Sequence, residues 1–145
     1  MDFLVICIGN PQGGDDALGP YIARKLKKLD IDVIDCETNP ENYTSVIKQI
    51  NPKKLIIIDA AEMGLEPGEI RIIPKEKIGV MTISTHGIPI SLLMNYLEKY
   101  IKEIILIAIQ PQDMNGKINM KIKEKANILV KIIKDKKINS LLILK

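Results

Sequence analysis

Short apolar runs alternate along the chain with longer stretches in which apolar residues recur at helical spacing. Phe3–Ile8, Lys54–Asp59 and Glu103–Ile109 are almost continuously apolar, as strands buried on both faces are. Ile31–Cys36 is predicted to be a further strand. Helical spacing covers Tyr21–Leu29, Pro40–Ile50, Ile90–Tyr100 and Asn119–Lys136. This alternation predicts an α/β fold with a mostly parallel sheet that helices cover on both faces.

The boundaries of these elements carry further signals. Pro20 suits the first position of a helix, and Asn39 is expected to cap a second helix that opens at Pro40. Ala60–Gly68 contains two glycines and a proline and is predicted to be a loop. Glu69–Ile73 alternates charged and apolar residues, which predicts one antiparallel strand at the edge of the sheet.

Two segments carry no clear pattern. Lys75–Pro89 is the longest stretch without periodicity. The final residues, INSLLILK, are either a short strand or a frayed turn, and both alternatives stay open.

The composition is that of an ordinary globular protein. The 145 residues are 46% hydrophobic and 27% charged, with no internal repeat or linker, so we expect one domain over residues 1–145. No apolar stretch approaches the ~20 residues of a membrane span. The first ten residues also lack the basic leader of a signal peptide. We therefore expect a cytoplasmic protein.

Charge and cysteine content exclude other classes of protein. The net charge of +3 arises mainly from lysines after Lys117, and a solvated helix face is the simplest interpretation. A nucleic-acid surface needs a denser basic stripe with interleaved aromatics, and aromatics are only 3% of the chain. Cys7 and Cys36 form no CxxC pair and lie within apolar runs, so we expect buried structural thiols.

Acidic residues follow two of the predicted strands at their carboxyl ends. In open α/β sheets, ligands bind beyond these ends, where the strand order reverses. Asp15 and Asp16 follow the first strand, and Asp59 closes the third. If the strand order is 2-1-3, these strands are neighbours and both acids look into one crevice. His86, the only histidine, lies in the long loop before the next helix, and Gln110 follows the last strand.

The glycine-rich segment around these acids does not match a phosphate loop. GNPQGGDDALGP, residues 9–20, is not G-x-G-x-x-G, and no Lys-Ser/Thr pair follows it. Two aspartates at a helix start repel phosphate and suit a cation. Plainer interpretations stay open, namely a tight turn for the glycines, helix N-caps for Asp15 and Asp16, a helix or turn cap for Asp59, and a structural role for His86.

Two carboxylates and one imidazole suit a divalent ion such as nickel, zinc, iron or manganese. Three protein ligands leave coordination positions open for water or substrate. Asp16, Asp59 and His86 therefore either hold a hydrolytic metal or grip a metal that another protein carries. The residues alone leave both alternatives open.

Four motifs together point to a known family. They are G-N-x-x-x-G-D-D-x-x-G-P at Gly9–Pro20, D-A-x-x-M-G-x-x-P-G-E-I-R-I-I at Asp59–Ile73, T-H-x-x-P at Thr85–Pro89 and I-Q-P at Ile109–Pro111. In these motifs the chain resembles the nickel–iron hydrogenase maturation endopeptidases, in the branch that serves hydrogenases related to formate hydrogenlyase. The resemblance ends near Gly116.

This resemblance implies a twisted three-layer α/β/α sandwich and a specific peptidase activity. Family members remove a C-terminal extension from the hydrogenase large-subunit precursor after nickel insertion, without a nucleotide or organic cofactor. The resemblance also implies that Asp16, Asp59 and His86 are catalytic and contact the nickel carried by the precursor. Some relatives have glutamate at the first of these positions. Asp16 and Asp59 are both candidates for the base, Asp15 is expected to shape the loop, and Gln110 is expected to contact either backbone or substrate.

Other functions are alternatives. A non-catalytic nickel-binding chaperone of hydrogenase assembly would use the same ligands and bind the precursor without cleaving it. G-N-P after a first strand also occurs in peptidyl-tRNA hydrolases, but their working histidine follows soon afterwards, whereas here no histidine precedes His86. The adjacent aspartates disfavour a nucleotide-binding module. We expect a monomer that binds neither nucleic acid nor membrane.

Overall fold

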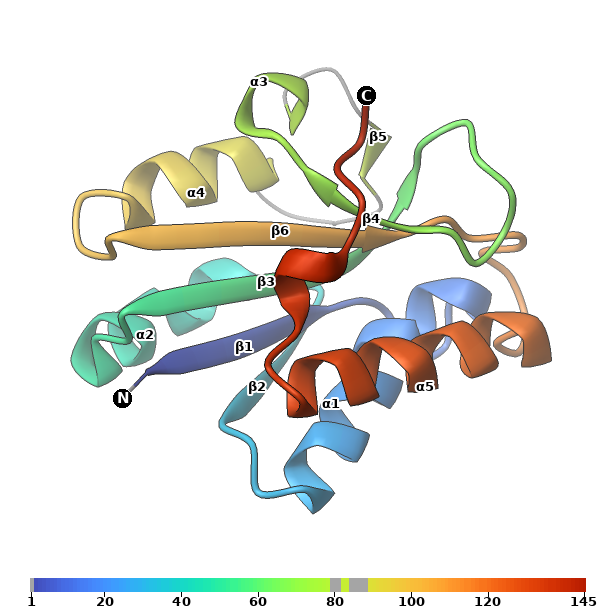
Figure 1. Cartoon of the computed structure of the whole chain (residues 1–145), viewed down its shortest axis with the longest axis horizontal. Coiled ribbons are helices and arrows are strands. Elements are labelled where there is room, and N and C mark those ends of the chain that lie inside the picture. Colours follow the sequence, from blue (N-terminus) through green and yellow to red (C-terminus); the bar gives the residue numbers. More distant parts are fainter. Residues whose placement is uncertain (1, 79–81, 84–88) are drawn as a thin grey trace.

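The computed structural model describes residues 2–78, 82–83 and 89–145. Its centre is a twisted β-sheet with helices on both faces (Figure 1). The strands are β1 (Phe3–Ile8), β2 (Val33–Glu37), β3 (Lys54–Glu62), β4 (Ile70–Ile73), β5 (Thr82–Ile83) and β6 (Glu103–Ile109). The α-helices are α1 (Leu18–Lys28), α2 (Thr44–Ile50), α3 (Lys75–Ile78), α4 (Ile90–Leu97) and α5 (Met120–Lys134). Short 3-10 helices are η1 (Gly14–Ala17), η2 (Pro40–Tyr43) and η3 (Ile138–Ser140).

The strand order is β2-β1-β3-β6-β4, with β5 paired to the end of β3. Strands β2, β1, β3 and β6 run parallel to one another. β4 runs antiparallel at the edge, as the alternation over Glu69–Ile73 predicts. In the sheet, β2 lies on one side of β1 and β3 lies on the other side. The order therefore reverses between β1 and β3, and the conditional 2-1-3 order is confirmed.

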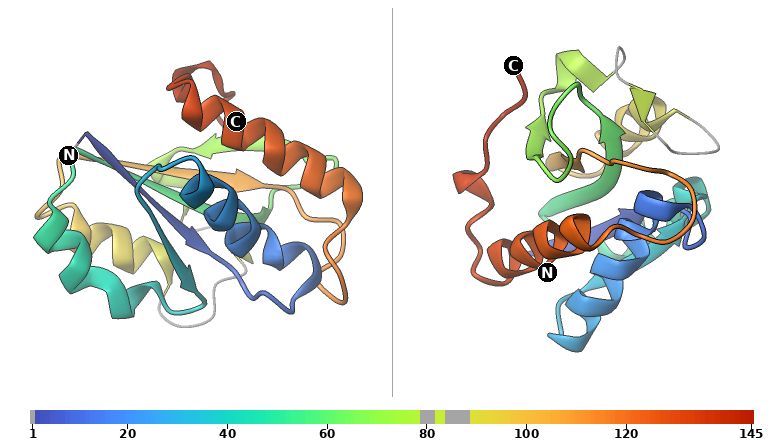
Figure 2. Two further views of the ribbon diagram at one scale, coloured as in Figure 1. Left: turned by 90° about the horizontal axis from the view of Figure 1, so that it is seen from below. Right: turned by 90° about the vertical axis from the view of Figure 1, so that its right-hand side faces the viewer.

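Side chains alternate along the strands between two separate cores. In β1, Leu4, Ile6 and Ile8 pack with residues of α2 and α4, whereas Val5 and Cys7 pack with residues of α1 and α5. Figure 2 shows the two helix pairs on opposite faces of the sheet. Two cores separated by one sheet make three layers, so the predicted sandwich is confirmed.

β3 is three residues longer than its apolar run predicts. The run predicts a strand that ends at Asp59 and a loop that begins at Ala60, but β3 continues to Glu62. Pairing with β1 stops at Ile58, pairing with β6 reaches Ala60, and β5 pairs with Ala61 and Glu62. Alanine and glutamate are weak strand formers. The extension therefore depends on partner strands that are distant in the sequence.

Two helix starts also differ from the sequence prediction. α1 begins at Leu18, directly after η1, so Pro20 is its third residue and not its first. Proline is tolerated there because the first four N–H groups of a helix have no intrahelical acceptor. Asn39 makes no side-chain cap, and Pro40 opens the 3-10 helix η2 before α2 starts at Thr44.

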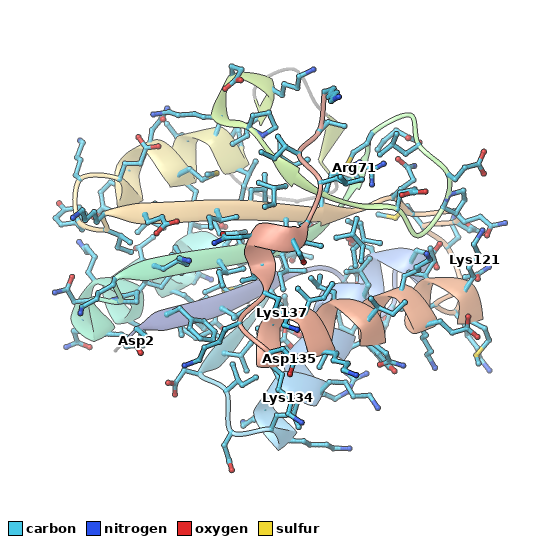
Figure 3. The ribbon with its side chains drawn as sticks, in the orientation of Figure 1. Asp2, Arg71, Lys121, Lys134, Asp135 and Lys137 are labelled. Carbon is cyan, nitrogen blue, oxygen red and sulfur yellow. The ribbon has the colours of Figure 1, made fainter. Side chains whose placement is uncertain are left out.

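The C-terminal third combines an exposed lysine face with a docked tail. Lys121, Lys134 and Lys137, labelled in Figure 3, are exposed on and after α5, as a solvated helix face predicts. After α5 the chain forms η3 and then a single parallel bridge between Ile143 and Ile72 of β4. In the part of the chain that the structure describes, no helix has both the length and the apolar character that a membrane crossing needs.

Candidate active site

Asp16 lies in η1, the 3-10 turn that follows β1. It is 1% exposed, and its Oδ2 accepts a hydrogen bond from the backbone N–H of Asn10 at 2.9 Å. Gly9 lies directly against this turn, because a Cβ at Gly9 would collide with the carbonyl oxygen of Asp16. The close approach requires glycine, and it fixes Asp16 at the carboxyl end of β1.

Asp15 precedes Asp16 but binds a different part of the molecule. Its Oδ2 accepts hydrogen bonds from the N–H groups of Gln112 and Asp113 at 2.7 and 2.8 Å, and its Oδ1 accepts one from the N–H of Asn119 at 2.8 Å. The carboxylate thereby ties η1 to the connection between β6 and α5, which arches across this edge in the right-hand view of Figure 2. Neither aspartate is the N-cap of α1, whose cap makes no side-chain bond. The helix-cap interpretation is wrong, and Asp15 shapes the loop.

Asp59 lies inside β3 and is completely buried. Its Oδ1 accepts a hydrogen bond from the N–H of Ala60 at 2.8 Å. Because residues alternate along a strand, Asp59 shares the sheet face of Ile57 and Ala61, which belong to the core under α2 and α4. A position inside a strand also rules out the turn or helix cap that was open from the sequence.

Asp16 and Asp59 are brought to one edge by two adjacent strands. β1 pairs with β3 up to Cys7 and Ile58, and Asp59 follows immediately. η1, which carries Asp16, contacts β3. This edge is the switch point of the sheet, where ligands of open α/β proteins bind. Ionised carboxylates buried this deeply are costly unless hydrogen-bond donors, a proton or a cation compensate for the charge.

His86 lies outside the described residues, so its place relative to the two carboxylates stays a prediction. The last described pairing before it joins Ile83 to Ala61, two residues beyond Asp59 in β3. Over residues 2–78, 82–83 and 89–145, no three His, Cys, Asp or Glu side chains are grouped so that they could hold a metal ion. The described part of the chain thus contains two of the three residues predicted to contact a metal.

A polar hollow opens beside Asn10. Its volume is about 520 Å³, and it is lined by Asn10, Pro11, Gln12, Glu37, Thr38 and Asn39. These residues come from the ends of β1 and β2 and the segments that follow them, so the hollow lies at the same carboxyl edge as Asp16. Because the N–H of Asn10 binds the Asp16 carboxylate, the wall of the hollow is directly connected to the candidate site.

The two cysteines take no part in the chemistry of this edge. Cys7 and Cys36 are buried and free, as the sequence predicts. Burial raises the pKa of Cys7 well above its usual value and raises the pKa of Cys36 to about 12. Because the thiolate is the nucleophile and the metal ligand, these raised pKa values disfavour both roles for Cys7 and Cys36 at neutral pH.

Gln110, expected to contact either backbone or substrate, contacts backbone. Its side-chain oxygen accepts hydrogen bonds from the N–H groups of Met63 and Leu65, and its nitrogen donates to the Glu62 carboxylate at 2.7 Å. Hydrogen bonds from the N–H of Gly64 and from Gln110 lower the pKa of Glu62. No local pattern in the sequence signals this network, because Gln110 is 45 to 48 residues away from its partners Leu65 and Glu62.

Fold and site together define a three-layer α/β protein with buried carboxylates at the switch point of its sheet. The family model described as hydrogenase maturation protease, HycI, matches residues 19–136. The chain therefore belongs to the hydrogenase maturation proteases, a family of peptidases, and is a hydrolase. The family resemblance carried by the four sequence motifs is confirmed.

Individual relatives agree with this assignment. The chain is 41% identical over 115 residues to the hydrogenase 3 maturation protease of Escherichia coli K12, covering 77% of this chain and 74% of the relative. It is 32% identical over 152 aligned positions to a putative hydrogenase maturation protease of Methanocaldococcus jannaschii, covering 93% and 90%. The solution structure of the endopeptidase HycI from Escherichia coli matches with a TM-score of 0.91 at 32% identity, covering 100% of this chain and 97% of that one.

Proposed function

We propose that this protein is an endopeptidase that removes the C-terminal extension of a nickel–iron hydrogenase large-subunit precursor after nickel insertion. One observation carries the proposal: a member of this peptidase family buries Asp16 and Asp59 at one edge, where β1 and β3 part. Asp15 beside them ties η1 to the connection between β6 and α5. Two more buried acids at the same edge are costly when ionised, and a shared cation offsets that cost.

The nickel of the precursor is the recognition element in this proposal. Asp16, Asp59 and His86 offer it two oxygens and one nitrogen, a set that borderline divalent ions accept. Contact between these side chains and the nickel anchors the nearby peptide bond at the sheet edge. A nickel-free precursor lacks the anchor and is not cut. The proposed mechanism requires neither a nucleotide nor an organic cofactor, because the nickel that the substrate carries supplies the Lewis acid.

Peptide hydrolysis requires a polarised carbonyl group and an activated water molecule. The divalent ion of the substrate polarises the carbonyl as a Lewis acid. A carboxylate of Asp16 or Asp59 accepts the proton of the attacking water as general base, and the resulting carboxylic acid donates that proton to the leaving amine as the C–N bond breaks. The N–H groups of Asn10 and Ala60 hold these carboxylates in place. The hollow beside Asn10 admits the chain segment next to the cleaved bond.

Mass spectrometry of the precursor tests the proposal directly. Incubation with nickel-loaded precursor should release the C-terminal peptide, and incubation with nickel-free precursor should not. Asp16→Asn, Asp59→Asn and His86→Ala should each abolish release. Asp135→Asn is the matched control, because Asp135 is an exposed aspartate just after α5 and outside the candidate site (Figure 3).

Each alternative result has a defined meaning. Equal cleavage of nickel-free precursor contradicts the role of nickel in recognition. Full activity of His86→Ala contradicts the assignment of the site. Stable binding of nickel-loaded precursor without any release would favour a nickel-binding chaperone, which membership of a peptidase family disfavours.

A further inference from the structure

The segment between β3 and β4, residues 63–69, contains no helix or strand, yet one side chain holds it. Gln110 is 3% exposed at the carboxyl end of β6. Its Oε1 accepts hydrogen bonds from the N–H groups of Met63 at 2.7 Å and Leu65 at 3.3 Å. Its Nε2 donates to Oε2 of Glu62 at 2.7 Å and to the carbonyl of Pro111 at 3.2 Å. Two donors on one side and two acceptors on the other permit only one orientation of the amide.

The backbone of Gln110 fixes the far end of the same segment. The N–H of Gly68 donates to the Gln110 carbonyl at 2.8 Å, and the N–H of Gln110 donates to the carbonyl of Glu69 at 2.9 Å. Arg71 on β4, labelled in Figure 3, donates to the Glu69 carboxylate at 2.9 Å. One residue thus joins the beginning and the end of the segment. The Glu62 carboxylate adds a bond from the N–H of Gly64 at 2.9 Å.

The held segment lies near Asp59, at the edge of the sheet where the precursor is proposed to bind. It begins four residues after Asp59, at the carboxyl edge of the sheet toward which β3 and β6 point in Figure 1. Glu62, Gly64 and Glu66 are exposed there. A loop that is already ordered when a partner binds loses less conformational entropy than a mobile loop. The buried Gln110 amide orders a loop that is itself exposed. This arrangement favours a role for the loop's surface over a role in packing the core.

We infer that Gln110 is a positioning residue that holds residues 63–69 as a preformed wall of the active site, against which the precursor binds. This inference rests on the proposed function. Gln110 touches neither substrate nor reacting atoms in this role, and it acts through Glu62 and the N–H groups of Met63 and Leu65. Loss of the network should therefore weaken precursor binding more than it slows the chemical step.

The test measures kcat and KM on nickel-loaded precursor for Gln110→Glu, Glu62→Gln and the double variant. Gln110→Glu keeps the shape but turns a carboxylate oxygen toward the Glu62 carboxylate and the Pro111 carbonyl. KM should rise about tenfold, the equivalent of ordering one or two side chains, with kcat changed less than about threefold. Glu62→Gln should stay close to wild type, because its amide oxygen still accepts. The double variant restores a donor between the two positions but leaves a carboxylate oxygen facing the Pro111 carbonyl, so it should reverse part of the rise in KM.

Gln49→Glu is the matched control, because it makes the same change at an exposed position near the end of α2, away from the carboxyl edge of the sheet. Its kinetics should be unchanged. If Gln110 only stabilised the fold, Gln110→Glu would lower kcat through loss of folded enzyme and leave KM unchanged, and that result would overturn the inference. Should Gln110→Glu fail to fold, Glu62→Ala removes the part of the network that ends on the Glu62 carboxylate, namely the bonds from Gln110 and from the N–H of Gly64. An unchanged KM in Glu62→Ala, together with faster amide exchange at Gly64, would equally overturn it. Absence of cleavage by the wild type would contradict the proposed function instead.

Discussion

Replacing Asp15 by asparagine tests the division of roles between the two adjacent aspartates. The Asp15 carboxylate accepts three backbone hydrogen bonds, at 2.7, 2.8 and 2.8 Å. An asparagine has a single amide oxygen, which can keep the bonds from Gln112 and Asp113. Its NH₂ group then faces the N–H of Asn119, and two donors oppose each other.

The expected loss of stability is about 3 kcal/mol. Hydrogen bonds to a charged group contribute about 1.5–3 kcal/mol and neutral ones about 0.5–1.5, so each of the two kept bonds weakens by roughly 1 kcal/mol. The third bond is lost, and an N–H left without an acceptor costs about 1–3 kcal/mol. Asn119 is only partly buried, which allows water to offset some of this loss. For a domain of this size, about 3 kcal/mol lowers Tm by roughly 6–12 °C.

Thermal unfolding of Asp15→Asn and Asp16→Asn, followed by calorimetry, checks this reasoning. Asp16→Asn keeps an oxygen for the N–H of Asn10, so its Tm should fall less than that of Asp15→Asn while its cleavage activity disappears. Asp15→Asn should show the large fall in Tm and still cleave precursor well below that temperature. An unchanged Tm for Asp15→Asn, or an equal fall for Asp16→Asn, would refute the assigned roles.

Three further predictions concern the core, the thiols and the loop. Ile57→Ala should destabilise the protein by about 2–5 kcal/mol in urea unfolding, because Ile57 is completely buried; a loss below ~1 kcal/mol would contradict its place in the core. Cys7 and Cys36 should not react with a thiol reagent at pH 8 in the native state, because burial raises both pKa values, and both should react in denaturant; native-state labelling would count against their burial. The pKa of Glu62 is lowered in the folded protein, in part by the bond from the N–H of Gly64. The stability that this bond contributes should be fully present above the ordinary glutamate pKa of about 4.3 and should be lost as the pH falls through the lower folded pKa. An NMR titration of the Glu62 carboxyl with a midpoint at or above about 4.3 would contradict this.

The apolar runs predict the strands that build the sheet because burial on both faces leaves a continuous signal. The predicted bounds of Phe3–Ile8 and Glu103–Ile109 match β1 and β6. The end of β3 is different, because Ala60 to Glu62 have weak strand propensity and are held by neighbouring strands. A single sequence contains no signal for such pairings.

The candidate site divides in the same way. The switch-point rule, applied to the predicted strand order, places Asp16 and Asp59 at one edge before any coordinates are known. The roles of Asp15 and Gln110 are not predictable in detail, because their partners are backbone N–H groups and side chains 45 to 104 residues away. Any residue type can supply a backbone N–H, so composition and spacing carry no trace of these contacts.

The central claim is that Asp16 and Asp59 contact the nickel of the precursor. Anomalous diffraction at the nickel edge tests it most directly. The crystals would contain the wild-type protein bound to a nickel-loaded precursor whose cleavage site has been made resistant. The account predicts one nickel peak about 2.0–2.2 Å from a carboxylate oxygen of Asp16 and from one of Asp59, the separation typical of carboxylates on zinc-like divalent ions. A nickel ion beyond contact distance of both carboxylates in the bound complex would contradict it.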